Sequence, residues 1–158
     1  MIAQLGQGML TSVLIYALTL IGAVPLALPL ALARGGKSKI ARLLTGAYIS
    51  FMRGTPLMLQ LIAVYFGPWY LFRIRISDGY RFYAVIIAFV LNYAAYFAEI
   101  YRAGIAAVPK GQREAAAVLG YTNAQAFFRI VLPQVIKHIL PPMANEFITL
   151  RILRWRLL

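Results

Sequence analysis

The stretch GMLTSVLIYALTLIGAVPLALPLALA, residues 8–33, holds 26 consecutive positions without a charged side chain. A helix needs about 20 apolar residues to cross the hydrocarbon of a bilayer, so this run is long enough. A secretory signal peptide fits less well, because no Lys or Arg precedes the run and the run is too long. The stretch therefore predicts a membrane-spanning helix.

The composition of the whole chain agrees with a membrane protein. Of its 158 residues, 62% are hydrophobic and 13% are charged, whereas a soluble domain carries about 45–50% apolar and about 25% charged residues. The net charge of +12 could suggest nucleic-acid binding, but the charges lie between apolar runs and the aromatics lie inside them, as in membrane proteins. The chain has no cysteine, which excludes disulfides and thiolate metal sites. We expect an all-α, polytopic membrane helix bundle that binds no nucleic acid.

The basic residues set the expected orientation. Arg34, Lys37, Lys39 and Arg42 directly follow the first span, which places this loop in the cytoplasm and the N-terminus outside. Further spans are expected at about Pro56–Phe72, at about Phe82–Tyr101, and from Leu132 or Val135 to Leu150. The sequence thus predicts about four spans in a single membrane domain, residues 1–158.

Two shorter segments flank the second expected span. Residues 40–52 are amphipathic and are expected along the membrane interface. Thr55 is expected to cap the next helix, and Pro56 to take its first position. After that helix comes a short outer loop with Arg73, Arg75, Asp78 and Arg81, whose three Arg depart from the charge rule.

The segment EAAAVLGYTNAQAFFRIVLPQ, residues 114–134, is too polar for a span and reads as two short helices. Pro109 is expected to start the first helix and Gly120 to stop it. Thr122 and Gln125 have the spacing of a capping box, which starts the second. Pro133 is expected to separate the second short helix from the span that follows it. A rigid helical corner of this kind suits docking into a groove on another protein.

The same segment resembles the EAA coupling loop of bacterial ABC-importer permease subunits. The resemblance rests on seven spaced positions: Glu114, Ala115, Ala116, Gly120, Ile130, Leu132 and Pro133. Residues 53–57, 98–112 and 145–148 also resemble the polar amino-acid permeases, the histidine, arginine and glutamine importers. The similarity extends to about Leu150.

This resemblance implies a transmembrane permease subunit of the bacterial cytoplasmic (inner) membrane. Two permease subunits, identical or different, would form the translocation path, and an external binding protein would deliver the amino acid. An ATP-binding cassette ATPase would dock on the loop at about residues 103–133, through the seven positions named above. ATP and Mg²⁺ belong to that ATPase, so this chain is expected to hold no cofactor or metal and to have no catalytic residue.

Three polar residues within the spans are candidates for the substrate path: Asn92, Asn145 and Glu146. Asparagines also tie membrane helices together, and we favour that role for Asn92. We favour the path for Glu146, because a carboxylate in lipid is costly. Glu99 and Arg102 are expected to form an ion pair across one helical turn.

Alternative readings remain at this point. One is a channel or transporter subunit that uses no ATP. A membrane-embedded enzyme ranks last, because it needs a cluster of His, Asp or Glu, and the chain has four acids and one histidine spread along it. The polar amino-acid permeases have a further span after Asn-Glu-Phe-Ile, whereas residues 151–158 read RILRWRLL. This tail suggests a C-terminally truncated and inactive permease.

Overall fold

The computed structural model describes residues 2–73, 77 and 79–157, with side chains for all of these except residues 2–5, 7 and 151–157. Arg75 and Asp78 of the expected outer loop, and the side chains of the tail, lie outside the described residues. All regular structure within the described ranges is helical, which confirms the all-α prediction. Its elements are α1 (Ile2–Gly35), α2 (Lys39–Gly54), α3 (Leu57–Phe72), α4 (Tyr80–Ala107), α5 (Lys110–Val118), α6 (Asn123–Ala126), the π-helical turn η1 (Phe127–Val131) and α7 (Leu132–Leu157).

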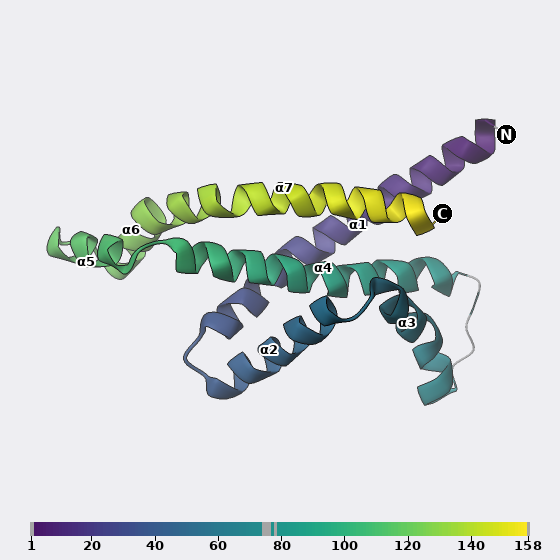
Figure 1. Ribbon diagram of the computed structural model, residues 1–158, viewed down its shortest axis with the longest axis horizontal. Coiled ribbons are helices and arrows are strands. Elements are labelled where there is room, and N and C mark those ends of the chain that lie inside the picture. Colours follow the sequence, from purple (N-terminus) through teal and green to yellow (C-terminus); the bar gives the residue numbers. More distant parts are fainter. Residues whose placement is uncertain (1, 74–76, 78, 158) are drawn as a thin grey trace. The chain divides into compact units, whose positions relative to one another are not determined.

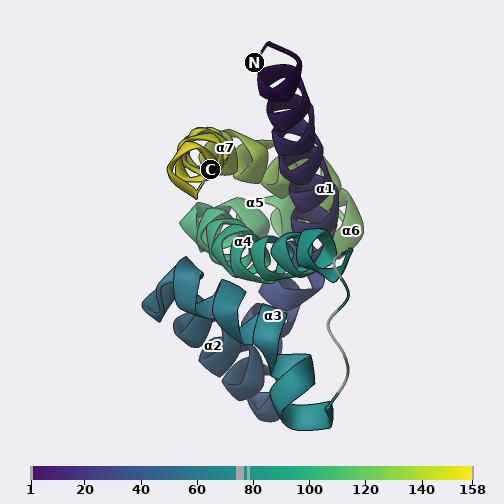
Figure 2. The same ribbon diagram turned by 90° about the vertical axis from the view of Figure 1, so that its right-hand side faces the viewer.

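Two helices are long and apolar enough to cross a membrane alone. They are the Gly8–Gly35 part of α1 and all of α4, each 28 residues long, with mean hydropathies of 2.2 and 1.6. Figure 2 shows α1 as one continuous helix leading away from the N-terminus. These helices confirm the first and third expected spans.

The helices α2 and α3 meet the same criterion only when taken together. They are bent by 110° at the break between them, and Figure 1 shows the chain turning sharply there. The described residues therefore hold two candidate spans, or three if the bent pair counts as one. The helix α7 is not among them, because Lys137, His138, Asn145 and Glu146 reduce its apolar character. The fourth helix is present as expected, and its place in the membrane stays a prediction.

The break between α2 and α3 differs from the expected cap. Pro56 is the N-cap of α3, not its first residue. Thr55 instead closes α2: its hydroxyl donates to the Phe51 carbonyl (2.8 Å), and its N–H bonds the same oxygen (3.1 Å). The expected role of Thr55 is therefore wrong. A residue before proline is pushed to extended backbone, and Thr55 accordingly ends one helix and does not open the next.

By packing, the chain divides into two compact units, residues 1–98 and 99–158, and each is described by itself. In the first unit the buried core is made largely of small residues, including Ala23, Ala27 and Ala31 of α1 and Ala84, Ala88, Ala94 and Ala95 of α4. At Gly22 an added Cβ would lie 2.9 Å from a Val90 methyl. Small residues let membrane helices approach closely, so α1 and α4 can pack at short range here.

An amide clasp fixes the α2–α3 break to α4 in this unit. The clasp consists of the Asn92 and Gln60 side chains and the Met52 carbonyl. The Asn92 amide donates to Gln60 Oε1 (2.9 Å) and to the Met52 carbonyl (3.1 Å). The Gln60 amide in turn donates to the Met52 carbonyl (2.9 Å) and to Thr55 Oγ1 (2.8 Å). The backbone groups that the break frees are thus bonded by side chains.

The second unit is held by the end of α4 and the start of α7. Val108, Val131 and Val135 form its buried cluster, with Ile105 and Ile139 packed against them. A Cβ added at Gly104 would lie 2.3 Å from Ile139 Cγ2, so this approach requires glycine. Figure 1 shows α5 and α6 at the end where α4 finishes and α7 begins.

Candidate functional site: the helical corner at α5 and α6

The first half of the corner is α5, which begins and ends as the sequence predicts. Pro109 is its N-cap and Leu119 its C-cap. Gly120 follows with φ +79°, and its N–H bonds the Ala117 carbonyl (3.0 Å). The N–H of Tyr121 bonds the Ala116 carbonyl (3.0 Å). Glycine takes this left-handed conformation without strain, so the predicted helix stop at Gly120 is confirmed.

The second half of the corner starts immediately with a complete capping box. Thr122 Oγ1 accepts from the Gln125 N–H (3.3 Å), and Gln125 Oε1 accepts from the Thr122 N–H (2.9 Å). Both partners of the predicted box are therefore in place. Only Tyr121 separates the left-handed glycine from the new cap, which makes the direction change sharp and locally fixed.

The passage from the corner into α7 differs from the sequence expectation. Pro133 does not break the helix, because α6, η1 and α7 follow one another without a gap. In η1 the turn is wider, and the Leu132 N–H bonds the Phe127 carbonyl five residues back. A proline ring clashes with the carbonyl four residues earlier, here that of Arg129. The wider turn lets the chain continue past Pro133, so the corner leads directly into α7.

The seven EAA positions differ in their exposure. Ala116 is buried in the corner, Ile130 and Leu132 are half-buried, and Glu114, Ala115, Gly120 and Pro133 are exposed. The buried and half-buried members shape the corner, and the exposed ones are available to a partner.

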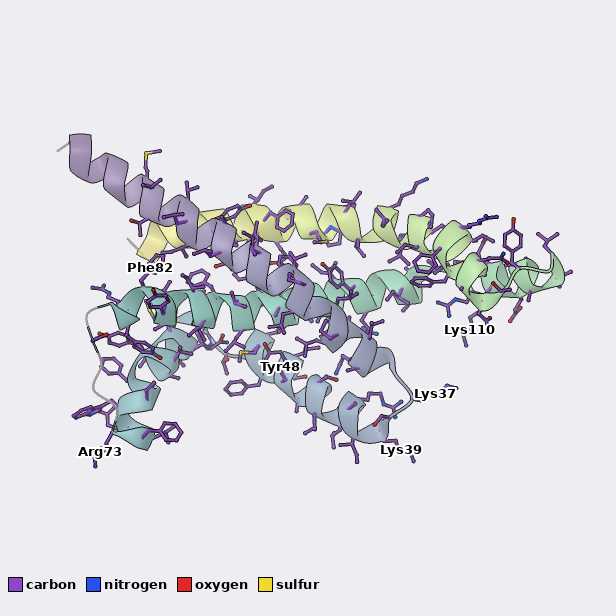
Figure 3. All side chains as sticks on the ribbon, turned by 180° about the vertical axis from the view of Figure 1, so that it is seen from behind. Lys37, Lys39, Tyr48, Arg73, Phe82 and Lys110 are labelled. Atoms are coloured by element: carbon purple, nitrogen blue, oxygen red, sulfur yellow. The ribbon has the colours of Figure 1, made fainter. Side chains whose placement is uncertain are left out.

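The structure adds three exposed apolar side chains that the sequence reasoning did not select. Val118 is 88% exposed, Leu119 74% and Phe128 65%. The signal was present in the sequence, since Val118 and Leu119 stand beside the helix stop, where neighbouring side chains point in different directions. Lys110 and Arg113 of α5 and Arg129 of η1 are exposed as well, and Figure 3 shows Lys110 on this corner. The corner therefore carries both exposed apolar and exposed basic side chains, and we call Val118, Leu119 and Phe128 its apolar edge.

The polar candidates for the substrate path divide between the two units. Asn92 is 5% exposed in the first unit, and its donors are used in the amide clasp. This geometry supports the helix-tying role that we favoured for it. Asn145 is exposed and Glu146 half-buried, both on α7 in the second unit.

The expected ion pair near the end of α4 is present. Arg102 Nε donates to both Glu99 carboxylate oxygens, at 3.1 and 3.0 Å. Among the described residues, no three His, Asp or Glu side chains gather where they could hold a metal ion.

Known proteins resemble this chain along most of its length. The family model of the binding-protein-dependent transport system inner membrane component matches residues 23–152. An L-cystine transport system permease protein of Bacillus subtilis is 40% identical, over 92% of this chain and 61% of its own length. An arginine transport system permease protein of the same organism is 48% identical, over 65% of this chain and 46% of its own length.

A solved structure also resembles this chain in its three-dimensional fold. It is the crystal structure of an amino acid ABC transporter with histidines, which matches with a TM-score of 0.80 and 39% sequence identity. The match covers 92% of this chain and 66% of that one. The chain therefore spans about half to two-thirds of the length of these relatives. Since the family model covers most of the chain, the chain belongs to the family of binding-protein-dependent transport system inner membrane components.

Proposed function

We propose that this chain is the permease subunit of an ATP-driven amino-acid importer and that an ATPase subunit docks on the α5–α6 corner. The observation that carries the proposal is the apolar edge of the corner, Val118, Leu119 and Phe128, held out from a rigid backbone. Exposed apolar side chains on a fixed helix suit insertion into a groove of a partner protein. ATP and Mg²⁺ act on that partner, and this chain contributes no catalytic group.

The corner is built to transmit movement. The left-handed Gly120 and the capping box fix the angle between α5 and α6. α5 packs against α6 and η1, and η1 continues into α7. A displacement of α5 by the ATPase would therefore be passed to α7 as a rigid-body movement. A second permease subunit would complete the path, and an external binding protein would deliver the amino acid.

We place the N-terminus outside and both basic loops in the cytoplasm. The support is the charge distribution, with four Lys and Arg between residues 34 and 42 and four between residues 102 and 129. A cysteine introduced at the exposed Ser38 tests this orientation, because the chain has no cysteine of its own. Labelling of this cysteine from outside intact cells would show that the orientation is reversed.

Within the path, Glu146 is the residue we assign to the substrate. Its carboxylate would attract the ammonium group that every amino acid carries, and Asn145 beside it offers an amide. Uptake should show a raised KM in Glu146→Gln, with unchanged binding of the ATPase. Equal KM values in the variant and the parent would remove Glu146 from the path.

Gly120→Val tests the coupling role in the assembled complex. A β-branched residue resists the φ of +79° at this position, although a Cβ there would meet no atom within 4 Å. The variant should insert normally and lose most of the substrate-stimulated ATP hydrolysis.

The control for this test is Gly111→Ala, an addition at a glycine of α5 that also has open space around it. It should keep the stimulation. Full stimulation in Gly120→Val would exclude the corner angle from the mechanism. Failure of the chain to co-purify with any ATPase subunit would favour the alternative of a transporter that uses no ATP.

A further inference from the structure

Positive charge gathers where α1 meets α2. Lys37, Lys39 and Arg42 are exposed, and Arg34 is half-buried at the end of α1. Figure 3 shows Lys37 and Lys39 together at this turn. In residues 1–98 the sequence has one acid, Asp78, which lies outside the described residues. The cations at this turn therefore have no acidic residue near them in sequence.

The fold brings Arg34 onto the same flank of α2 as the other charges. At about 100° per residue, Lys39, Arg42 and Gly46 lie along one side of the helix. Arg34 Nη1 lies only 2.4 Å from where a Cβ at Gly46 would stand, so the guanidinium crosses α2 at this glycine. We use the name basic strip for three residues: Lys39, Arg42, and Arg34, whose guanidinium lies over Gly46. Orientation in the membrane requires positive charge in the loop, but it does not require the charges to be gathered in this way.

An apolar stripe runs beside the basic strip. Ile40, Leu43 and Leu44 are 72%, 73% and 65% exposed, whereas Ile49 of the same helix is buried at 2%. α2 therefore has one face in the protein, one exposed apolar face and a basic flank next to it. An amphipathic helix with this arrangement lies at the boundary between lipid headgroups and acyl chains.

We propose that the basic strip and the apolar stripe of α2 together form a binding surface for anionic phospholipids. The strip takes the negatively charged headgroup, and the stripe contacts the acyl chains. A free anion would match the strip alone and would leave Ile40, Leu43 and Leu44 in water. The surface stands apart from substrate transport, and the test below needs neither an ATPase nor an amino acid.

The test places a reporter in the stripe. The exposed Ala47 is changed to Cys and carries a bimane dye, and the chain is reconstituted in phosphatidylcholine vesicles with some phosphatidylglycerol. Quenching by brominated phosphatidylglycerol is compared with quenching by brominated phosphatidylcholine at the same mole fraction. We expect the anionic lipid to quench several-fold more strongly. Removing charge by Lys39→Gln and Arg42→Gln should lower this preference by about fivefold per charge at low salt.

Two controls separate the strip from general charge effects. Arg73→Gln with Arg81→Gln removes the same charge from exposed positions elsewhere and should leave the preference unchanged. Gly46→Ala keeps every charge and displaces Arg34, so it should weaken the preference. Gly54→Ala, in the same helix and with no atom within 4 Å of its Cβ, should not.

Several results would overturn the proposal. Equal quenching by the two lipids would show no selectivity, and no quenching by either would show that protein covers the stripe. Loss of the preference in inorganic phosphate, but not in chloride of equal ionic strength, would identify a soluble-anion site. If the double variant inserts in the wrong orientation, the reporter chain with all its cations still tests the proposal. Its preference for the anionic lipid should fall steeply as the salt concentration is raised.

Discussion

The amide clasp predicts a specific cost for replacing Asn92. Asn92→Leu keeps a side chain of four heavy atoms branched at Cγ but removes the two bonds that Asn92 donates, to Gln60 Oε1 and to the Met52 carbonyl. Hydrogen bonds between membrane helices contribute about 0.6 kcal/mol on average and up to about 1.7 kcal/mol. Two such bonds, and a buried Gln60 oxygen left without its donor, give an expected loss of about 2 kcal/mol in the free energy of unfolding.

A double-mutant cycle shows whether the clasp acts as a unit. Gln60→Leu alone removes the donors to Met52 and Thr55, and it leaves the Asn92 amide with the Met52 carbonyl as its one remaining acceptor in the clasp. The double variant removes both amides, so neither is left unpaired. Its cost should be smaller than the sum of the single costs by about 1 kcal/mol or more.

Unfolding is measured in mixed micelles by titration with SDS. Dyes on cysteines at the exposed Ser38 and Ser77 report the separation of α2 from the start of α4. Ser50→Leu, a polar-to-leucine change at an exposed position of α2, is the control and should change stability by less than about 0.5 kcal/mol. Additive costs of Asn92→Leu and Gln60→Leu would show that the clasp bonds do not hold the break, and would refute the reasoning.

Further predictions concern the second unit. Gly104→Ala should destabilise it by about 1–3 kcal/mol, because the new Cβ would lie 2.3 Å from Ile139 Cγ2; adding Ile139→Ala should recover part of this loss in the same titration, and no recovery would contradict the assigned contact. Thr122→Ala should cost about 1 kcal/mol and speed hydrogen exchange at the Gln125 amide, whereas Thr122→Ser should not, because it keeps the hydroxyl that accepts from that amide. Equal exchange in the two variants would mean that the cap does not hold α6.

The sequence was sufficient to predict the structure at positions where one local rule determines it. The uncharged run at residues 8–33 predicted α1 within its true bounds, and Thr122 with Gln125 predicted the capping box. Gly120 predicted the left-handed residue after α5. In each case the deciding residues lie within a few positions of one another, so no tertiary contact was needed.

The features that the sequence could not supply depend on residues far apart in the chain. Gln60 and Asn92 are 32 positions apart, and nothing in either neighbourhood indicates that their amides meet. Arg34 lies on α2 because Gly46 leaves room for it, which only the packing of α1 against α2 shows.

The prolines show why the rule that a proline ends a helix failed at Pro133 and held at Pro56. Pro25, Pro29, Pro68, Pro141 and Pro142 lie inside helices, and Pro133 lies in the first turn of α7 with η1 directly before it. In lipid, a broken helix exposes backbone groups that cost several kcal/mol each, more than the about 3 kcal/mol that a proline costs within the helix. A helix that continues through the proline therefore costs less free energy than a helix that breaks there. The chain does break at Pro56, and there the freed groups have partners: Gln60 Nε2 bonds the Met52 and Thr55 carbonyls, and the Thr55 hydroxyl bonds the Phe51 carbonyl. At Pro56 nearby side chains therefore bond the carbonyls that the break frees, and the amide clasp supports the bend between α2 and α3.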